Sequence, residues 1–143
     1  MTYQARDIAE YIIYREASQG RTVSNLRLQK LLYFVQAQFI VQKDVPCFTE
    51  RMEAWDFGPV VPEVYRAYKF YGSNAIPYTK TSFRHIDDAD KVLIDSMLDS
   101  CSDYSTSTLV DMTHSQNPWK FAYQNPLDNE ITISSMYHYF KES

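Results

Sequence analysis

The side chains able to do acid–base, nucleophilic or metal chemistry are few in this sequence and lie far apart. The histidines are His85, His114 and His138, and the cysteines are Cys47 and Cys101. None of them is paired at the spacing of a zinc site, and neither cysteine lies in a recognisable catalytic sequence. The two thiols match no disulfide framework either, so we expect them to be buried in a protein of a reducing compartment. The sequence therefore predicts no metal and no cofactor.

Other catalytic motifs are equally scarce. The chain has only 3 glycines, which disfavours a glycine-rich phosphate-binding loop, and no serine lies in a nucleophile-elbow sequence. The acidic pair Asp87-Asp88 is typical of a helix start, where the helix dipole favours negative charge. We expect that the protein is not an enzyme. The alternative is a small enzyme in which His114 acts with a nearby carboxylate.

Charge and hydrophobicity narrow the class of partner. The chain has 14 Lys and Arg against 18 Asp and Glu, and its basic residues are scattered, which disfavours direct binding to nucleic acid. No apolar run approaches the roughly 20 residues that span a membrane, and the N-terminus lacks a signal-peptide pattern. A length of 143 residues with 45% hydrophobic content is typical of a single globular domain, here residues 1–143. We expect a cytoplasmic protein that binds no membrane.

An unusual aromatic segment runs over residues 53–65. It contains Trp55 and Phe57 beside Gly58-Pro59, and its two X-Pro steps stiffen the backbone. A rigid loop with aromatic neighbours favours protein binding; the alternative is a buried Trp55 that locks the loop to the core. We predict a protein-binding patch made of aromatic side chains from this segment and the helix after it: Trp55, Phe57, Tyr65, Tyr68 and Tyr71.

A second unusual segment covers residues 113–119, where a helix end, a polar turn and a new helix start follow one another. Asn117-Pro118 is typical of a helix start. When protonated, His114 could stabilise the last carbonyl groups of the preceding helix, and when neutral it could bond a backbone carbonyl. These structural roles are favoured over a catalytic histidine.

Helical periodicity predicts a mainly α fold, a compact bundle of about six or seven helices. The clearest helix is capped by Ser24 or Asn25 and ends near residues 43–44. Its apolar residues recur at three- and four-residue steps: Leu28, Leu31, Leu32, Val35 and Phe39. Three polar residues lie off that stripe: Arg27, Lys30 and Gln38.

Capping signals bound the other helices. We expect one from Thr2 to about Gln19, with Gly20 as a left-handed cap, and one that starts at Pro62 and stops at Gly72. Residues 73–85 have no helical period and are predicted to be a loop. Further helices should begin at four capping sites: Asp87 or Asp88, Ser105, Asn117, and Ser134 or Ser135.

Two regions leave alternatives open. The helix after residue 87 has two candidate inward faces, one with Val92, Leu93 and Met97 and the other with Ile94 and Leu98. Residues 48–57 are either a short strand or an extended loop, and residues 131–133 are the best strand candidate. Together they predict a small two-stranded β element.

Four stretches of the sequence form an ordered pattern that spans positions 7 to 119. They are residues 7–12, residues 24–37 with the sequence SNLRLQKLLYFVQA, residues 53–65 with EAWDFGPVVPEVY, and Thr113-His114 with Pro118-Trp119. In this order they resemble the Panacea domain, the SocA-like antitoxin family that includes phage-associated GepA-like proteins. We expect the residues of this pattern to be mainly structural: Leu28, Gln29, Lys30, Leu31, Tyr33, Gly58, Pro59, Thr113, His114, Pro118 and Trp119.

The resemblance implies a function in a toxin–antitoxin system. Members of the family are typically encoded beside a toxin gene and neutralise the toxin by direct contact, and the SocA branch also delivers its toxin to the ClpXP protease. The first hypothesis is therefore an antitoxin that binds a cognate toxin protein. The second is a proteolytic adaptor for ClpXP, and the third is the small enzyme using His114.

Overall fold

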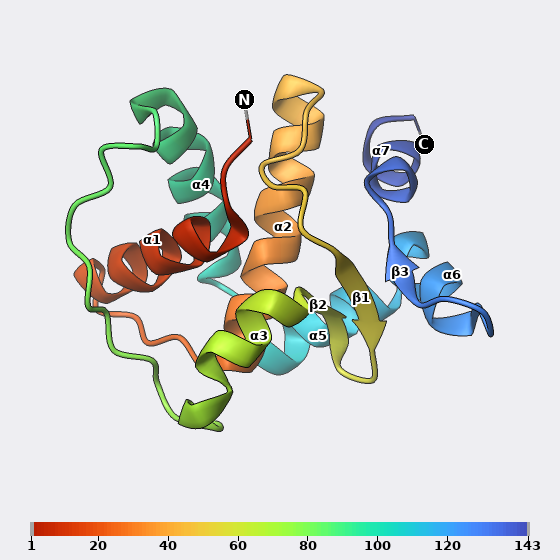
Figure 1. Ribbon diagram of the computed structural model, residues 1–143, viewed down its shortest axis with the longest axis horizontal. Coiled ribbons are helices and arrows are strands. Elements are labelled where there is room, and N and C mark those ends of the chain that lie inside the picture. Colours follow the sequence, from red (N-terminus) through yellow and green to blue (C-terminus); the bar gives the residue numbers. More distant parts are fainter. Residues whose placement is uncertain (1, 143) are drawn as a thin grey trace.

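A central helix organises the protein. The computed structural model describes residues 2–142, and helix α2 (Asn25–Lys43) runs through its middle (Figure 1). Its neighbours come from most of the chain: α1 (Ala5–Ser18), α3 (Pro62–Tyr68), α4 (Asp88–Cys101), α5 (Thr106–His114), α7 (Ile133–Lys141) and strand β2 (Gly58–Val60). Every residue from Leu28 to Ala37 is buried. Lys30 lies off the apolar stripe but is nevertheless buried, because neighbours surround α2 rather than covering one face.

The mainly α prediction is confirmed. Residues 2–142 contain seven α-helices, including α6 (Asn117–Gln124), and a short 3-10 helix, η1 (Lys69–Tyr71), which continues α3. The Ser24 hydroxyl accepts the Arg27 N–H at 3.2 Å and so caps α2 as predicted. Gly20 follows α1 with a φ of 74°, as expected of a left-handed residue after a helix end.

Three predicted helix starts are wrong by a few residues. Helix α1 begins at Ala5 rather than after Thr2, because the Glu50 carboxylate accepts the Ala5 N–H at 2.7 Å. Helix α7 is capped by Thr132, whose hydroxyl accepts the Ser135 N–H at 3.0 Å, rather than by either serine. Helix α6 includes Asn117, and the residue before it is its N-cap.

The β element has three strands rather than two, in the order β2-β1-β3. Strand β1 (Met52–Trp55) pairs antiparallel with β3 (Glu130–Ile131), which confirms the predicted pairing. Strand β1 also forms a hairpin with β2, a strand that the sequence did not predict. Proline is tolerated here because β2 is an edge strand.

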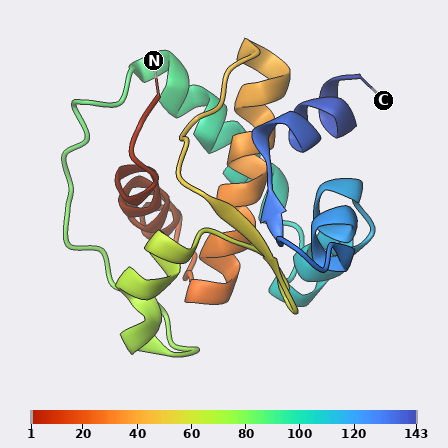
Figure 2. The ribbon, with the colours of Figure 1, turned by 45° about the vertical axis from the view of Figure 1, so that its right-hand side comes forward.

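The remaining segments cover the flanks of α1 and α2. In helix α4 the inward face is the one with Ile94 and Leu98, both fully buried, whereas Val92 is 65% exposed. The predicted loop between η1 and α4 runs round the outside of α1 (Figure 2). Its buried anchors are Ile76 and Phe83, and the Phe83 ring meets the Tyr11 ring edge-on at 5.2 Å. Both cysteines are buried and free, as predicted.

Two observations concern residues 2–142 as a whole. Every buried side-chain nitrogen and oxygen atom among them has a hydrogen-bond partner. None of the helices they form combines the length and the hydrophobicity needed to cross a lipid bilayer.

Candidate protein-binding site

Three aromatic side chains of α5 and α6 hold the turn of the β1–β2 hairpin by hydrogen bonds. The Trp119 indole N–H donates to the Trp55 carbonyl at 2.8 Å. The His114 Nε2 lies 3.0 Å from the Asp56 carbonyl, which can only accept, so Nε2 carries the hydrogen. The Tyr123 hydroxyl donates to the Asp56 carboxylate. Helices α5 and α6 thus fix two carbonyls at the turn, those of Trp55 and Asp56.

These rings also support one another. The His114 ring packs on the Trp119 ring at a centroid distance of 4.2 Å, and Trp119 stacks on Tyr123 at 4.4 Å with 17° between the planes. Pairs of aromatic rings in such geometry contribute about 0.5–1.5 kcal/mol beyond their buried area. Trp119 and Tyr123 lie one helical turn apart on α6, which places them on one face. The His114–Trp119–Tyr123 column is therefore a stiff support for the turn.

Helix α2 holds the other edge of the hairpin. The Lys30 ammonium group donates to the Pro59 carbonyl at 2.7 Å, and the Gln29 side-chain carbonyl accepts the Val61 N–H at 2.9 Å. Both contacts use backbone groups at or just beyond the outer edge of β2. An unpaired strand edge would otherwise be a site for pairing with another chain. The α2 side chains therefore occupy this edge of the sheet, and the turn is the part of the hairpin that they do not contact.

Gly58 is required at the start of β2 for two reasons. Its φ is 105°, a value that side chains other than glycine rarely adopt. A Cβ atom at this position would also lie 2.8 Å from Lys30 Cε and 2.8 Å from Thr113 Oγ1. The side chain of Thr113 is itself fixed, since its hydroxyl donates to the Val110 carbonyl at 2.7 Å. The close packing of Lys30, Gly58 and Thr113 thus joins α2, the hairpin and α5.

Lys30 has an unusual electrostatic environment. Its side chain is fully buried, and the partner of its Nζ atom is a neutral carbonyl rather than a carboxylate. Loss of hydration penalises the charged form and lowers the pKa of Lys30 to about 7. At neutral pH a large fraction of this lysine is therefore uncharged.

An apolar groove of about 650 Å³ opens beside the turn that His114, Trp119 and Tyr123 hold, and we call it the hairpin groove. Its walls come from the hairpin, α3 with η1, the N-terminal end of α2, and α6 with the segment after it. The aromatic and aliphatic lining residues include Leu26, Trp55, Phe57, Val60, Tyr65 and Tyr123, and the polar ones include Asn25, Asp56, Lys69 and Asn129. The Trp55 and Tyr65 rings meet edge-on at 5.0 Å, and Phe57 is 67% exposed. The groove can accept an apolar side chain of another protein.

Comparison with known proteins decides the family. Residues 28–120 match the family model described as "Antitoxin SocA-like, Panacea domain". The chain is also 35% identical over 137 residues to "Antitoxin SocA" of Caulobacter vibrioides (strain NA1000 / CB15N), an alignment that covers 87% of this chain and 73% of that protein. This chain belongs to the SocA-like Panacea family. No solved structure matches it. Family membership supports an antitoxin role and a toxin as the partner.

The Panacea motifs converge on the hairpin. Most of their residues are buried, and the structure brings Gln29, Lys30, Gly58, Thr113 and His114 together around it, although they come from three distant stretches of sequence. Three others belong to the core or its border: Leu28, Leu31 and Tyr33. The His114 ring makes one of the backbone contacts that sequence analysis considered for it. The motifs thus position the hairpin turn.

Three of the five aromatic residues predicted for the binding patch line the hairpin groove: Trp55, Phe57 and Tyr65. Tyr68 and Tyr71 do not. They line a separate cavity of about 80 Å³ on the α1 side of α3, where their centroids lie 6.5 Å apart. The structure therefore divides the predicted patch into two places.

Sequence reasoning missed several lining residues of the groove. Leu26 was an apolar residue outside the stripe of α2, which is a signal for an exposed contact. Tyr123 lies four residues after Trp119, a spacing that places both on one helix face. Asn129 precedes the strand β3 and had no signal in the sequence. Among residues 2–142, no group of three or more His, Cys, Asp or Glu side chains could hold a metal ion.

Proposed function

We propose that this chain is an antitoxin that neutralises its cognate toxin by direct contact through the hairpin groove. The observation that supports this is the position of Phe57. This large apolar side chain lies on the turn that α5 and α6 hold, and it is 67% exposed at the mouth of an apolar groove. Contiguous apolar surface marks sites of protein contact, and Phe57 extends the apolar lining of the groove. Family membership supports a toxin as that partner.

The geometry suits a preorganised binding centre. Tight protein interfaces depend on a few aromatic or arginine side chains near the centre of the contact. Because the hairpin turn is held by Trp119, His114 and Tyr123 before binding, less conformational entropy is lost on association. An interface of standard size buries roughly 800 Å² on each partner, and the groove with its surroundings can be the centre of such a surface.

The same contacts favour a role without catalysis. The His114 Nε2–H donates to the Asp56 carbonyl and its ring packs on Trp119, so the imidazole positions the turn. A general base needs its free nitrogen within reach of a substrate proton. We therefore assign His114 to the support of the binding site.

The test is co-expression with the product of the neighbouring reading frame. Trp55→Ala and Phe57→Ala should abolish rescue of growth and weaken binding of the purified neighbour protein, with folding retained in circular dichroism. Phe70→Ala is the control, since Phe70 is 94% exposed on η1 and is outside the groove lining. A folded Trp55→Ala protein that still binds the toxin with unchanged affinity would overturn the proposal.

Delivery to the ClpXP protease is the alternative mode of neutralisation. Toxin half-life in cells with and without this protease separates the two modes. Neutralisation by occlusion predicts rescue of growth in both strains and an unchanged toxin half-life. An adaptor predicts that rescue is lost when the protease is absent.

A further inference from the structure

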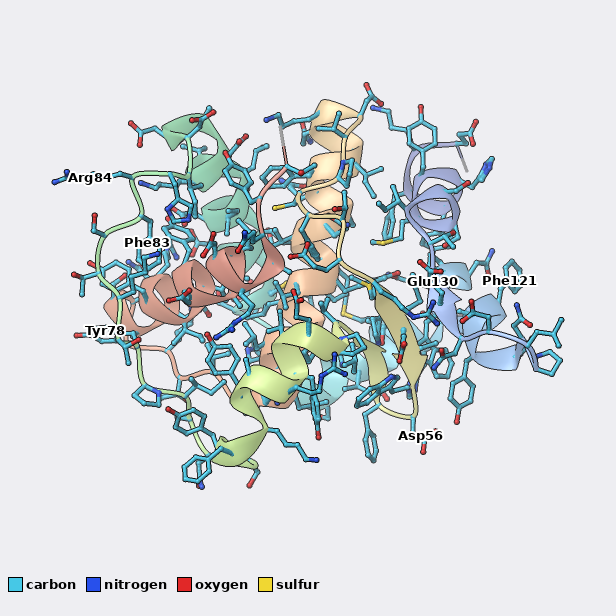
Figure 3. All side chains as sticks on the ribbon, viewed as in Figure 1. Asp56, Tyr78, Phe83, Arg84, Phe121 and Glu130 are labelled. Carbon is cyan, nitrogen blue, oxygen red and sulfur yellow. The ribbon has the colours of Figure 1, made fainter. Side chains whose placement is uncertain are left out.

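The hairpin groove has a border rich in carboxylates. Asp56 lies at the free end of the hairpin, and Glu130 lies on β3 beside it (Figure 3). We call this border the acidic rim and define it by four residues of the sheet and its connections: Glu53, Asp56, Asp128 and Glu130. It adjoins the groove through lining residues Trp55, Asp56 and Asn129.

One guanidinium group lies among these carboxylates. Arg51 pairs with Glu53 at 2.7 Å, with Glu130 at 3.2 Å and with Asp128. The indole N–H of Trp55 also donates to Glu53 at 2.9 Å. The Arg51 contact lowers the pKa of the Asp128 carboxyl. Burial raises the pKa of Glu53, but its bonds to Trp55 and Arg51 outweigh burial and lower it overall. Three carboxylates thus share one arginine, and the fourth, Asp56, accepts from the Tyr123 hydroxyl, so the rim carries net negative charge at neutral pH.

We propose that the segment of the toxin that enters the hairpin groove carries an apolar side chain next to lysine or arginine residues. This rests on the proposed function. The apolar side chain would contact Phe57, Trp55 and Tyr65, and the cationic group would face the acidic rim. Complementary charge at the border of an apolar contact directs the encounter and fixes the orientation of the partner.

The charge of the whole molecule favours this occupant over a second copy of the chain. The chain has a net charge of -4, so a symmetric dimer through this groove would bring two acidic rims together. Like charges in contact across an interface oppose association. A basic partner instead gains from both the local rim and the long-range field.

The test measures how fast the purified product of the neighbouring reading frame associates at several salt concentrations. The double variant Asp56→Asn, Glu130→Gln removes two rim charges. The matched control Asp87→Asn, Asp88→Asn removes two exposed charges at the start of α4, outside the groove lining. We expect the rim variant to associate about 3–10-fold more slowly at low salt and to depend less on salt. The control should change the rate by less than about twofold, because its two charges lie outside the groove lining.

The outcomes separate this inference from the proposed function. If Phe57→Ala weakens binding but the rim variant associates as fast as the control variant at every salt concentration, the groove is the site and its cationic occupant is wrong. Faster association of the rim variant would also overturn the inference. If the folded Trp55→Ala protein binds with unchanged affinity, the proposed function itself fails.

Discussion

Strand β2, which we call the base because it packs on α2 and α5, and the turn of the same hairpin, which we call the free end, differ in how they are packed. At the base, Gly58 and Pro59 are buried against Lys30 and Thr113 with almost no spare space. At the free end, Asp56 and Phe57 are exposed although their backbone is held by α5 and α6. The Panacea motif residues gather mainly at the base. We infer two roles from this difference. The base keeps the hairpin in its position, and the free end is available to contact a partner.

The largest effect should come from the base. Gly58→Ala introduces a Cβ atom within 2.8 Å of two fixed side chains at a φ of 105°, so we expect a loss of about 3 kcal/mol in the free energy of unfolding. Urea denaturation measures it. Gly20→Ala is the control, since Gly20 has a φ of 74° but open space around it, and should lose only about 1 kcal/mol. Equal losses would mean that the packing with Lys30 and Thr113 is unimportant.

The free end should show the reverse pattern. Phe57→Ala removes an exposed ring, so we expect the free energy of unfolding to change by less than about 0.5 kcal/mol. Binding of the toxin should weaken by about 30-fold, or roughly 2 kcal/mol, the size typical of an aromatic at the centre of an interface. Calorimetric titration of Phe57→Ala and of the Phe70→Ala control measures this. A Phe57→Ala protein that loses stability but keeps its affinity for the toxin would mean that Phe57 supports the fold and does not bind the partner.

The buried lysine makes the stability of the base depend on pH. The pKa of Lys30 is lowered to about 7 in the folded protein and is about 10.4 in an unfolded chain. Between these values the unfolded state binds more protons, so the folded state gains stability as pH rises. From pH 7 to pH 9 this amounts to about 2 kcal/mol. Urea denaturation at the two pH values measures this change in the free energy of unfolding, and Lys30→Met should remove most of it. An unchanged pH dependence in this variant would mean that other groups cause it.

The smallest effect concerns the support of the free end. Tyr123→Phe keeps the stack on Trp119 but removes the bond to the Asp56 carboxylate. We expect stability to change by less than about 0.5 kcal/mol and toxin binding to weaken by about threefold. Tyr137→Phe on α7 is the matched control. If both variants bind equally well, the Tyr123 bond does not help to position the turn.

Local sequence signals were sufficient for most of the helices. The stripe of α2 and the hydroxyl caps at Ser24 and Ser105 act over three or four residues, so a pattern along the chain reveals them. Strand β2 was missed because Gly58-Pro59 argues against a strand unless that strand lies at the edge of a sheet. The position of β2 at the edge depends on which strands pair with β1, and no local pattern could reveal that.

The site was predictable only in part for the same reason. Trp55, Phe57 and Tyr65 were found because they are clustered in sequence beside two prolines. Tyr68 was assigned to the same patch by proximity, but α3 turns it toward α1. Tyr123 reaches the groove from α6, and only the packing of α6 beneath the hairpin brings it there.

The most direct test is hydrogen exchange of the free protein and of its complex with the product of the neighbouring reading frame. We expect binding to add protection at residues 55–58, at Tyr65 and at the N-terminal end of α2, while the already buried middle of α2 changes little. Added protection confined to α7 or to the loop over residues 73–87, with the hairpin turn exchanging as in the free protein, would contradict this expectation.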